Sequence, residues 1–488
     1  MPTGTIRISW TQTQRSIVPA YNDHVIMAHN NNFFNVYGQV LHNGSYVSPT
    51  DVKYILRCTC VAGLAGEVIL KKSTDFNSDF KAYFNVEEFV QDHVETDIES
   101  YTVHNQALVP TPIHHIENYN KNIANLRRFN FEVAVEYRVS GTLVTTAYFA
   151  QPSLVPMYAQ EVYFWNGVNK KINDEEFRIS DYYTTGTTKN TLTDFPTNTL
   201  ATVDDAIRQK ISSDQYHTIA FFCGGHKDHA TASFKLADMG RVRIRLYNSS
   251  GSLVENNTIT NNTTNGGWQP VAGQFFKTSP DGTRGQHGLL YFGCGLKNLT
   301  AAGNLTASNI ETGGFYTVEF EDSTGAGAYK PLIFDITDSD CRGYENIRLA
   351  WLNQVGTWDY YNFSKLSQKT FTSNKKTYRQ NHGKVIDDFN NGHDIQSYQG
   401  GNKVFNNSVK QTIEINTDFI TEEEALFLKG CFTSPLVQWL TTNDRGTARV
   451  MPVVVNEKDY VVRTKANDKL IQYVLELEVG HDYRVQRT

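Results

Sequence analysis

Alternating apolar and polar side chains dominate two segments of the chain. In residues 129–139, Phe, Val and Tyr occupy the odd positions, while Asn, Glu and Arg occupy most even positions. Residues 241–246 alternate Arg with Val, Ile and Leu. A period of two places alternate side chains on opposite faces of a strand, so both segments predict half-buried β-strands. Ser140-Gly141 predicts a turn that leads the first strand back into a partner.

Helix signals are few: residues 86–94 and 203–211 could each form a short helix, and the best signal predicts an α-helix over residues 421–431. Thr421 and Glu424 have the spacing of a capping box, and three Glu lie in the first turn, where the helix dipole favours them. Lys429 and Gly430 suit the end of the helix. Strand-like runs surround it, at residues 410–416, 436–440, 449–456, 459–466 and 469–479.

Composition extends this picture to the whole chain. The 28 Phe and 26 Tyr, with only 5 Met, favour strands over helical bundles. A chain of 488 residues is too long for a single hydrophobic core, and a typical domain size of about 150 residues suggests three domains. We predict a mainly β, multidomain fold with two sandwiches of immunoglobulin or fibronectin type and a C-terminal sheet-plus-helix module. The predicted boundaries are 1–155, 156–346 with a polar insertion at 256–288, 347–399 as an aromatic hairpin and irregular connector, and 400–488.

Charge and apolar content narrow the expected partners. The net charge is −6 and no long run of one sign occurs, so we expect no direct nucleic-acid role and no anionic membrane partner. The first residues lack the apolar core of a secretory signal, and no run approaches the ~18 apolar residues of a membrane helix. Cys58 and Cys60 would share one strand face, which predicts reduced structural thiols.

The chain shows no motif of a known catalytic mechanism. It has no GxSxG elbow, GxxxxGK[ST] loop, HExxH helix or CxxC pair. GAGAYK at 325–330 imitates a phosphate loop but precedes a strand, so a hairpin turn is the favoured interpretation. We therefore expect no enzyme activity and no catalytic, metal or cofactor site.

Three weaker sets keep a functional alternative beside a structural one. The first set could bind zinc or could consist of solvated loop residues. The second set could include the carboxylate pair of a glycosidase or could consist of unrelated loop carboxylates. The third could face an anionic partner, or form a solvated or edge-protecting strand face. The sets are His226, His229 and Cys223; Asp335, Asp338, Asp340 and Asp359; and Arg241, Arg243 and Arg245.

The segment RLAWLNQVGTWDYYNF, residues 348–363, contains five aromatic side chains in sixteen positions. It predicts a strand, a turn and a strand, with Trp351 and Trp358 as possible cross-strand neighbours. Nearby apolar residues favour packing between domains or subunits, while stacking on a ligand is the alternative. The candidate packing or interface residues are Trp351, Trp358, Tyr360, Tyr361, Phe363 and Trp439.

This aromatic segment, in the form LxWLNxxGxxDYxxF, resembles a segment of structural proteins from tailed bacteriophages. Three other segments resemble parts of the same family in the same order: ISWTQTQRSIVPAYNDHVIMA, KAYFNVEEFVQDHVETD, and the closing region from INTDFITEEEALFLKGCF to LELEV. The closing region is similar to the module of tail-tube-like and distal-tail proteins, in which a capped helix lies on strands. The Asn/Thr-rich insertion at 256–288 departs from the family.

The resemblance implies a virion protein of the tail, baseplate or tail–capsid connection, made in the cytoplasm of the bacterial host. It implies contacts with copies of itself, in a ring of six or a multiple of six, and with other tail proteins. It implies no catalytic residue, and no cofactor is expected. The alternative is a receptor- or carbohydrate-binding component of a tail fibre or spike; a polysaccharide-degrading enzyme is a third hypothesis.

Overall fold

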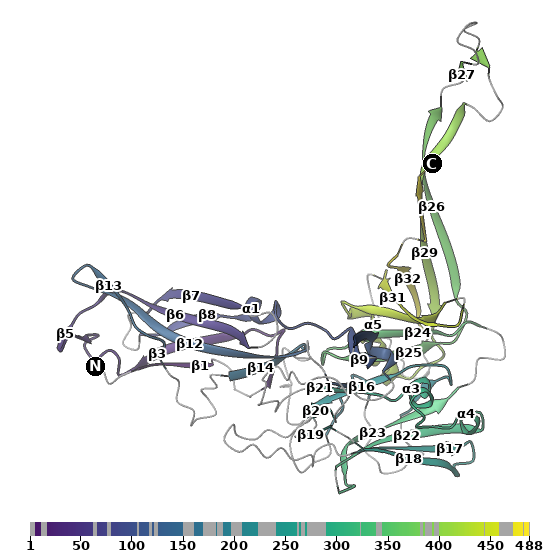
Figure 1. The fold of residues 1–488 in the computed structure, drawn as a ribbon, viewed down its shortest axis with the longest axis horizontal. Helices are drawn as coiled ribbons and strands as arrows, with labels where there is room; N and C mark the ends of the chain where they lie inside the picture. The colour runs from purple at the N-terminus through teal and green to yellow at the C-terminus, as the bar shows by residue number, and fades with distance from the viewer. Residues whose placement is uncertain are drawn as a thin grey trace. The chain divides into compact units, whose positions relative to one another are not determined.

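The structure is a computed structural model, and it confirms a mainly β, multidomain fold (Figure 1). The chain divides into two compact units: residues 1–336 with 353–359, and residues 337–352 with 360–488. The residues that the structure describes are 5–10, 17–61, 66–75, 80–104, 107–116, 120–121, 125–149, 161–168, 182, 189–196, 207–222, 241–260, 263–264, 269–270, 289–322, 324–337, 344–380, 384–385, 393–394, 400–443, 445–457, 472–481 and 483–487.

The first unit begins with a β-sandwich. One sheet has the order β1-β3-β8, and the other has the order β2-β14-β12-β6-β7 with β13 beside β12. Their strands are β1 (Thr5–Trp10), β2 (Ile17–Pro19), β3 (Val25–Asn31), β6 (Thr50–Val61), β7 (Glu67–Ser73), β8 (Ala82–Asn85), β12 (Leu126–Val139), β13 (Thr142–Thr145) and β14 (Glu161–Trp165). Apolar side chains of both sheets form one core, which includes Ile6, Ile26, Phe84, Leu56 and Phe131.

The first unit also contains several short elements. They are β4 (Val40–His42), β5 (Ser45–Val47), α1 (Glu87–Gln91), β9 (Glu99–His104), β10 (Ala107–Pro112) and the 3-10 helix η1 (Ile113–His115). β4 pairs with β5, and β9 pairs with β10, both antiparallel.

The strand predicted at 129–139 is confirmed as part of β12. Its odd-numbered side chains from Phe129 to Tyr137 are buried, as the alternation requires. On the opposite face, Glu136 pairs with Lys71 of β7 at 2.8 Å, and Glu132 pairs with Arg57 of β6. Ser140 and Gly141 have φ of 50° and 85°, which turns the chain into β13.

A second sandwich completes the first unit. Its sheets have the orders β15-β23-β22-β17-β18 and β11-β21-β16, and a two-stranded sheet joins β19 and β20. The elements are β11 (Asn120–Lys121), β15 (Gln209–Ile211), β16 (Thr218–Phe222), β17 (Arg241–Asn248), β18 (Leu253–Thr260), β19 (Thr263–Thr264), β20 (Gln269–Pro270), β21 (Leu289–Gly293), α3 (Leu296–Ala301), α4 (Ala307–Ile310), β22 (Gly313–Glu321) and β23 (Gly327–Ile336). Both larger sheets and both helices contribute to one core, as shown by Ile244, Phe292, Phe334, Leu299 and Ile310.

The second unit contains an eight-stranded sheet and the helix α5 (Glu422–Thr433). The sheet order is β25-β24-β30-β31-β32-β29-β26, with β33 beside β29. Its strands are β24 (Ile347–Leu352), β25 (Trp358–Phe363), β26 (Gln368–Gln380), β29 (Gly401–Asn416), β30 (Val437–Thr442), β31 (Ala448–Val455), β32 (Val474–Val479) and β33 (Arg484–Arg487); β27 (Lys384–Val385) pairs separately with β28 (His393–Asp394).

The predicted capped helix is confirmed in α5. Thr421 Oγ1 accepts from the backbone N–H of Glu424 at 3.3 Å, and Glu424 Oε2 accepts from the backbone N–H of Thr421 at 2.9 Å. This reciprocal pair satisfies two N–H groups at the start of the helix. Ala425, Leu428 and Cys431 are buried on one side of α5.

The irregular connector predicted within residues 347–399 is wrong for β26. Residues 368–380 form a continuous strand that pairs antiparallel with β29, so they belong to the same sheet as the C-terminal strands. β18 likewise extends to Thr260, into the predicted polar insertion, most of whose remaining residues lie outside the described ranges. The boundary between residues 155 and 156 stays a prediction, because residues 150–160 lie outside the described ranges. The strand expected at 459–466 also lies outside the described ranges and stays a prediction.

Candidate functional site

The aromatic hairpin predicted at 348–363 forms β24, a tight turn and β25. Within the turn, the N–H of Asn353 donates to Thr357 O at 2.8 Å, and the N–H of Gly356 donates to Asn353 O at 3.0 Å. The Asn353 side chain accepts from the N–H of Thr357 at 2.9 Å. Gly356 adopts φ of +79°, a conformation that glycine reaches without steric penalty. The turn is therefore held by specific hydrogen bonds.

Residues 353–359 belong to the first unit, where Trp358 is buried. Its indole Nε1–H donates to Asp97 O at 2.9 Å. The ring of His114 meets the Trp358 ring edge to face, with centroids 4.7 Å apart. Trp165 Nε1–H donates to Val355 O in the same turn, at 3.2 Å. The indole N–H groups of Trp358 and Trp165 therefore both have acceptors within the first unit.

The neighbouring His115 is held in the neutral state. Its ring lies 4.3 Å from the ring of Tyr216. Burial lowers the pKa of His115 to about 4, because the interior disfavours the charged imidazolium.

Asp359 is buried in the first unit and has structural partners. Its Oδ1 accepts from Thr193 Oγ1 at 2.5 Å, and its Oδ2 accepts from the N–H of Asp194 at 2.9 Å. Asp335 forms an ion pair with Arg208 at 2.9 Å. These partners account for the two described carboxylates structurally. Asp338 and Asp340, the other members of the predicted acidic set, lie outside the described residues.

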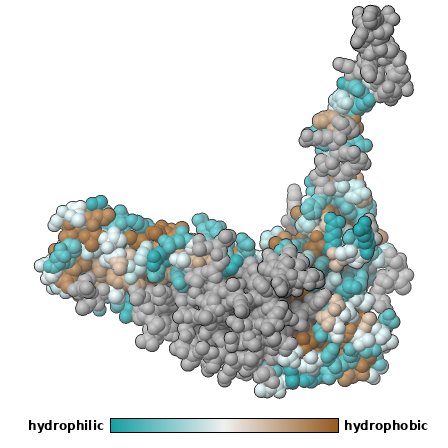
Figure 2. Space-filling view, viewed as in Figure 1, coloured by the Kyte–Doolittle hydropathy of each residue, from teal (hydrophilic) through white to brown (hydrophobic). Residues whose placement is uncertain are grey.

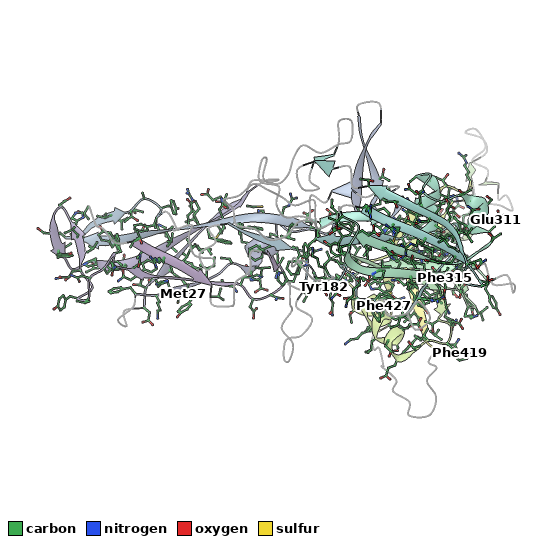
Figure 3. The ribbon with its side chains drawn as sticks, turned by 90° about the horizontal axis from the view of Figure 1, so that it is seen from below. Met27, Tyr182, Glu311, Phe315, Phe419 and Phe427 are labelled. Carbon is green, nitrogen blue, oxygen red and sulfur yellow. The ribbon has the colours of Figure 1, made fainter. Side chains whose placement is uncertain are left out.

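The remaining candidate aromatics lie in the second unit. Trp351 is buried, and its ring centroid lies 5.0 Å from that of Phe427. Phe427 belongs to α5 and is labelled in Figure 3. Gly430 permits this approach, because a Cβ there would lie 2.9 Å from Trp351 Nε1. The two indoles of the hairpin thus have separate aromatic partners, Phe427 for Trp351 and His114 for Trp358.

Tyr360 and Phe363 are also buried. The guanidinium of Arg348 lies 5.2 Å from the Tyr360 ring centroid, while Tyr361 and Phe363 meet edge to face at 5.0 Å. Burial, with the nearby charges of Glu424 and Asp418, raises the pKa of the half-buried Tyr361. Trp439 is buried beside Lys369 Nζ, which lies 5.5 Å from its ring. All six predicted aromatics therefore pack within the chain.

The predicted metal set lies outside the described residues, since none of His226, His229 and Cys223 is described. Within the described part of the chain, no group of three His, Cys, Asp or Glu side chains could hold a metal ion. The four described cysteines, Cys58, Cys60, Cys294 and Cys431, are buried, and no disulfide joins them to one another. Burial raises the pKa of Cys58 and of Cys431 to about 12, so both are thiols at neutral pH.

GAGAYK is confirmed as part of a hairpin, in which β22 pairs antiparallel with β23. Asp322 Oδ1 accepts from the N–H groups of Thr324 and Ala326 at 2.8 and 2.9 Å. These hydrogen bonds stabilise the turn, so residues 325–330 are explained by their role in the hairpin.

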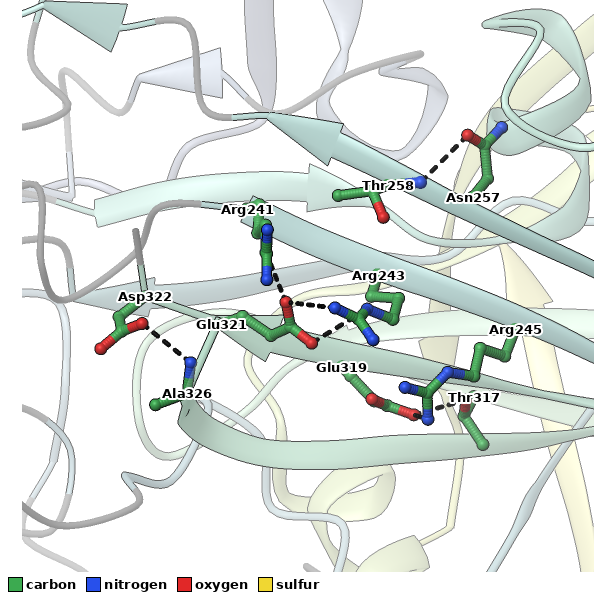
Figure 4. Close-up of polar contacts among 10 residues, drawn as sticks. All are labelled: Arg241, Arg243, Arg245, Asn257, Thr258, Thr317, Glu319, Glu321, Asp322 and Ala326. Atoms are coloured by element: carbon green, nitrogen blue, oxygen red, sulfur yellow. Dashed lines mark hydrogen bonds and ion pairs between the residues drawn. The ribbon is translucent and has the colours of Figure 1, made fainter. Parts of the chain in front are cut away.

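The arginine strip of β17 forms ion pairs with the neighbouring strand β22 (Figure 4). Glu321 contacts Arg241 Nε at 2.5 Å and Arg243 Nε at 3.0 Å, and Glu319 contacts Arg245 Nη1 at 2.9 Å. The Glu321 side chain is buried, and the two guanidinium groups supply the polar contacts that it loses to burial. The strip is a cross-strand network within the second sandwich.

We expect Glu321→Gln to lower the free energy of unfolding of this sandwich by about 1–3 kcal/mol, because two guanidinium groups would lose their shared carboxylate. Hydrogen exchange of the β17 amides would measure the change. Glu311→Gln is the matched control: Glu311 is exposed, and we expect a change within about 0.5 kcal/mol. Equal effects of the two substitutions would contradict a structural role for the network.

Two exposed features were missed by the sequence analysis. One is the mostly polar strand β26, whose lack of apolar alternation concealed it. The other is a pair of exposed tyrosines, Tyr37 and Tyr46, in short loops and strands of the first sandwich. The absence of Asp, Glu, Lys and Arg from residues 24–50 is a sequence signal that could have drawn attention to the second feature.

No family model and no curated protein matches the sequence. Among solved structures, Salmonella alpha-2-macroglobulin reacted with methylamine aligns with 97% of this chain and 23% of its own, at 8% identity and a TM-score of 0.19. This chain thus spans less than a quarter of the length of that protein. The Bacillus anthracis TIE protein aligns over 83% of this chain and 69% of its own, at 7% identity and a TM-score of 0.11. Likeness at these TM-scores does not establish a shared fold.

Among the helices that the structure describes, none combines the length and the apolar character needed to cross a bilayer.

Proposed function

We propose that this chain is a structural protein of a tailed bacteriophage, which forms a ring in the tail, baseplate or tail–capsid connection. Support comes from the ordered resemblance of its segments to phage structural proteins. A second support is β26 with its partner β29, which together form a long ribbon. No catalytic residue or cofactor is part of this proposal.

The ribbon is the observation that carries the proposal. β26 is 13 residues long, and all of its residues except Gln380 are exposed. It pairs with β29 along its whole length, from Gln368 opposite Glu414 to Gln380 opposite Gly401. Figure 1 shows β26 and β29 running together beyond β31 and β32 of the same sheet.

The ribbon exposes apolar side chains to solvent, and the strand β26 has no buried residue. Phe371, Tyr378 and Phe405 are exposed, and so is Tyr483, whose ring lies 4.8 Å from that of Phe371. An isolated pair of strands is at best marginally stable in water, because it buries too little apolar surface. A second protein surface against the ribbon would supply the missing burial.

Charge favours another copy of the chain as that surface. Every charged residue of β26, β29 and β33 except Glu414 is Lys or Arg, whereas the whole chain has a net charge of −6. The rest of the chain is consequently more acidic than the whole, so its net charge is opposite in sign to that of the ribbon. A contact between two different patches of identical chains is heterologous, and such contacts close into rings when the rotation permits.

Within the phage particle, we expect six copies or a multiple of six, in contact with other tail proteins. The alternative, a receptor- or carbohydrate-binding fibre or spike component, was expected to use Trp351 and Trp358. Their burial removes them as an exposed stacking platform. A sugar-binding role would need other aromatic side chains.

The test is the assembly state of the intact chain. We expect light scattering at low salt to show a ring, and the combined substitution of Lys375, Lys376 and Arg379 by Glu to weaken assembly by at least about tenfold. Lys297→Glu is the matched control, since Lys297 is an exposed lysine of α3 outside the ribbon. It should leave assembly unchanged.

Mass spectrometry and cryo-electron microscopy of purified phage particles would test the location. The proposal requires the chain in the particle, in contact with copies of itself. A monomer without such contacts, or absence from particles, would contradict it.

A further inference from the structure

An exposed, uncharged tip of the first sandwich has the composition of a sugar-binding surface. We call residues 35–46 the tyrosine tip; they include the loop 35–39, β4, and the start of β5. The side chains of Val36, Tyr37 and Tyr46 are 93%, 82% and 61% exposed. Figure 1 shows β5 at the end of the sandwich farthest from α1, and Figure 2 shows hydrophobic residues at the surface of this end.

The loop that presents Tyr37 is built around Asn35. Asn35 Oδ1 accepts from the N–H groups of Tyr37 and Gln39, each at 2.9 Å, and Asn35 Nδ2 donates to Gln39 Oε1 at 3.1 Å. Two backbone bonds close the loop, from the N–H of Asn35 to Gln39 O and from the N–H of Gly38 to Asn35 O, both 2.9 Å. Five hydrogen bonds therefore fix a loop whose apolar side chains face water.

The core of the sandwich anchors the same loop. Gly38 has φ of +72°, and a Cβ there would lie 2.8 Å from Phe80 Cζ. Phe80 in turn stacks on Phe34, with ring centroids 4.7 Å apart. The backbone next to Tyr37 thus packs directly against the buried pair of Phe80 and Phe34, and this contact limits the movement of the loop.

Tyr46 is presented by an equally short hairpin. His42 pairs with Ser45 across Asn43 and Gly44, which have φ of 47° and 84°. Asn-Gly with two positive φ angles is the preferred two-residue turn between antiparallel strands. Both tyrosines are therefore held by preorganised backbone, which reduces the entropy lost when a ligand binds.

The chemistry around the tyrosines is polar but uncharged. Residues 24–50 contain no Asp, Glu, Lys or Arg, and the tip itself offers amide, hydroxyl and imidazole groups from Gln39, Asn43, Ser45 and His42. The next charged residue, Asp51, is paired with Lys53 at 3.3 Å and with Arg138 at 3.5 Å. A neutral surface favours a neutral ligand over a phosphate, an acidic polymer or an anionic lipid.

We propose that the tyrosine tip binds a neutral carbohydrate. The apolar face of a sugar ring stacks on Tyr37 or Tyr46, and its hydroxyl groups form hydrogen bonds with the surrounding amides. Tyrosine suits this task because it offers a rigid aromatic face and a polar end with few rotatable bonds. The site is independent of the ribbon and does not require the proposed ring.

The test is binding of the intact chain to an array of neutral glycans that includes glucans, mannans and galactans. We expect retention on at least one of them. Tyr37→Ala and Tyr46→Ala should each weaken that binding by about tenfold, which is the scale of one lost aromatic contact. Both side chains are exposed, so we expect neither substitution to unfold the sandwich.

Tyr83→Ala is the matched control, because Tyr83 is an exposed tyrosine of β8 in the same sandwich but outside the tip. It should leave glycan binding unchanged. A lack of binding to every neutral glycan, or equal binding by the Tyr37→Ala, Tyr46→Ala double variant, would overturn the proposal. Flotation with phosphatidylcholine vesicles that is lost in Val36→Asn would instead identify a lipid site and overturn it as well.

Discussion

Gly356→Ala is expected to destabilise the first unit by about 2–5 kcal/mol. Two effects combine in this estimate. A left-handed backbone costs a residue with a Cβ about 1–2 kcal/mol, and overpacking adds about 1–3 kcal/mol. The φ of Gly356 is +79°, and an added Cβ would lie 1.6 Å from the carbonyl oxygen of Asn166. Because that obstacle is backbone, no side-chain rotation can relieve it.

Gly251→Ala separates the two effects. Gly251 has φ of +81°, but nothing lies within 4 Å of the position of a Cβ. It should cost only the backbone component, about 1–2 kcal/mol. Hydrogen exchange of amides in β12 and β21 would measure both variants without assuming that the whole chain unfolds in one step. Similar losses for the two variants would show that the close approach at Gly356 is unimportant.

Trp358→Ala is expected to destabilise the same unit by about 3–5 kcal/mol, since it removes a large buried ring and leaves a cavity. It would also leave Asp97 O without the indole donor and His114 without its aromatic partner. Trp358→Phe should have a smaller effect of about 1–3 kcal/mol, because an aromatic ring remains but the N–H donor is lost.

The control for Trp358 is Tyr83→Ala, which truncates an exposed aromatic and should change stability by no more than about 0.5 kcal/mol. The same hydrogen-exchange measurement applies. If Trp358→Ala falls within 1 kcal/mol of this control, the indole does not have the packing role that its burial indicates.

Local pattern predicted the elements that carry their own signal. β12 follows from alternation over eleven residues, and α5 follows from the capping residues Thr421 and Glu424. β26 carries no such signal, because a strand exposed on both faces has no reason to alternate. Its register with β29 depends on a pairing between residues more than twenty positions apart, which single-sequence periodicity does not encode.

The candidate site was predicted by residue type but not by partner. The aromatic richness of 348–363 indicated packing between domains or subunits. In the structure, five of the six selected aromatics are buried, and Tyr361 contacts Phe363. The partner of the Trp358 donor, Asp97 O, lies 261 residues away in the sequence, and nothing in either local segment indicates that pairing. The tyrosine tip was missed because exposure is a property of the fold: Tyr46 and the buried Tyr54 both lie in strands.

The division of the chain has a practical consequence for truncation. Residues 353–359 are part of the first compact unit, although they lie between β24 and Tyr360–Phe363 of the second. A fragment that ends at residue 336 would lack the buried Trp358 and Asp359. A fragment that starts at residue 337 would carry those seven residues without the groups that bind them, exposing an indole and a carboxylate that the intact chain conceals. No single cut in the chain separates the two units, because residues 353–359 of the first unit lie within the sequence of the second.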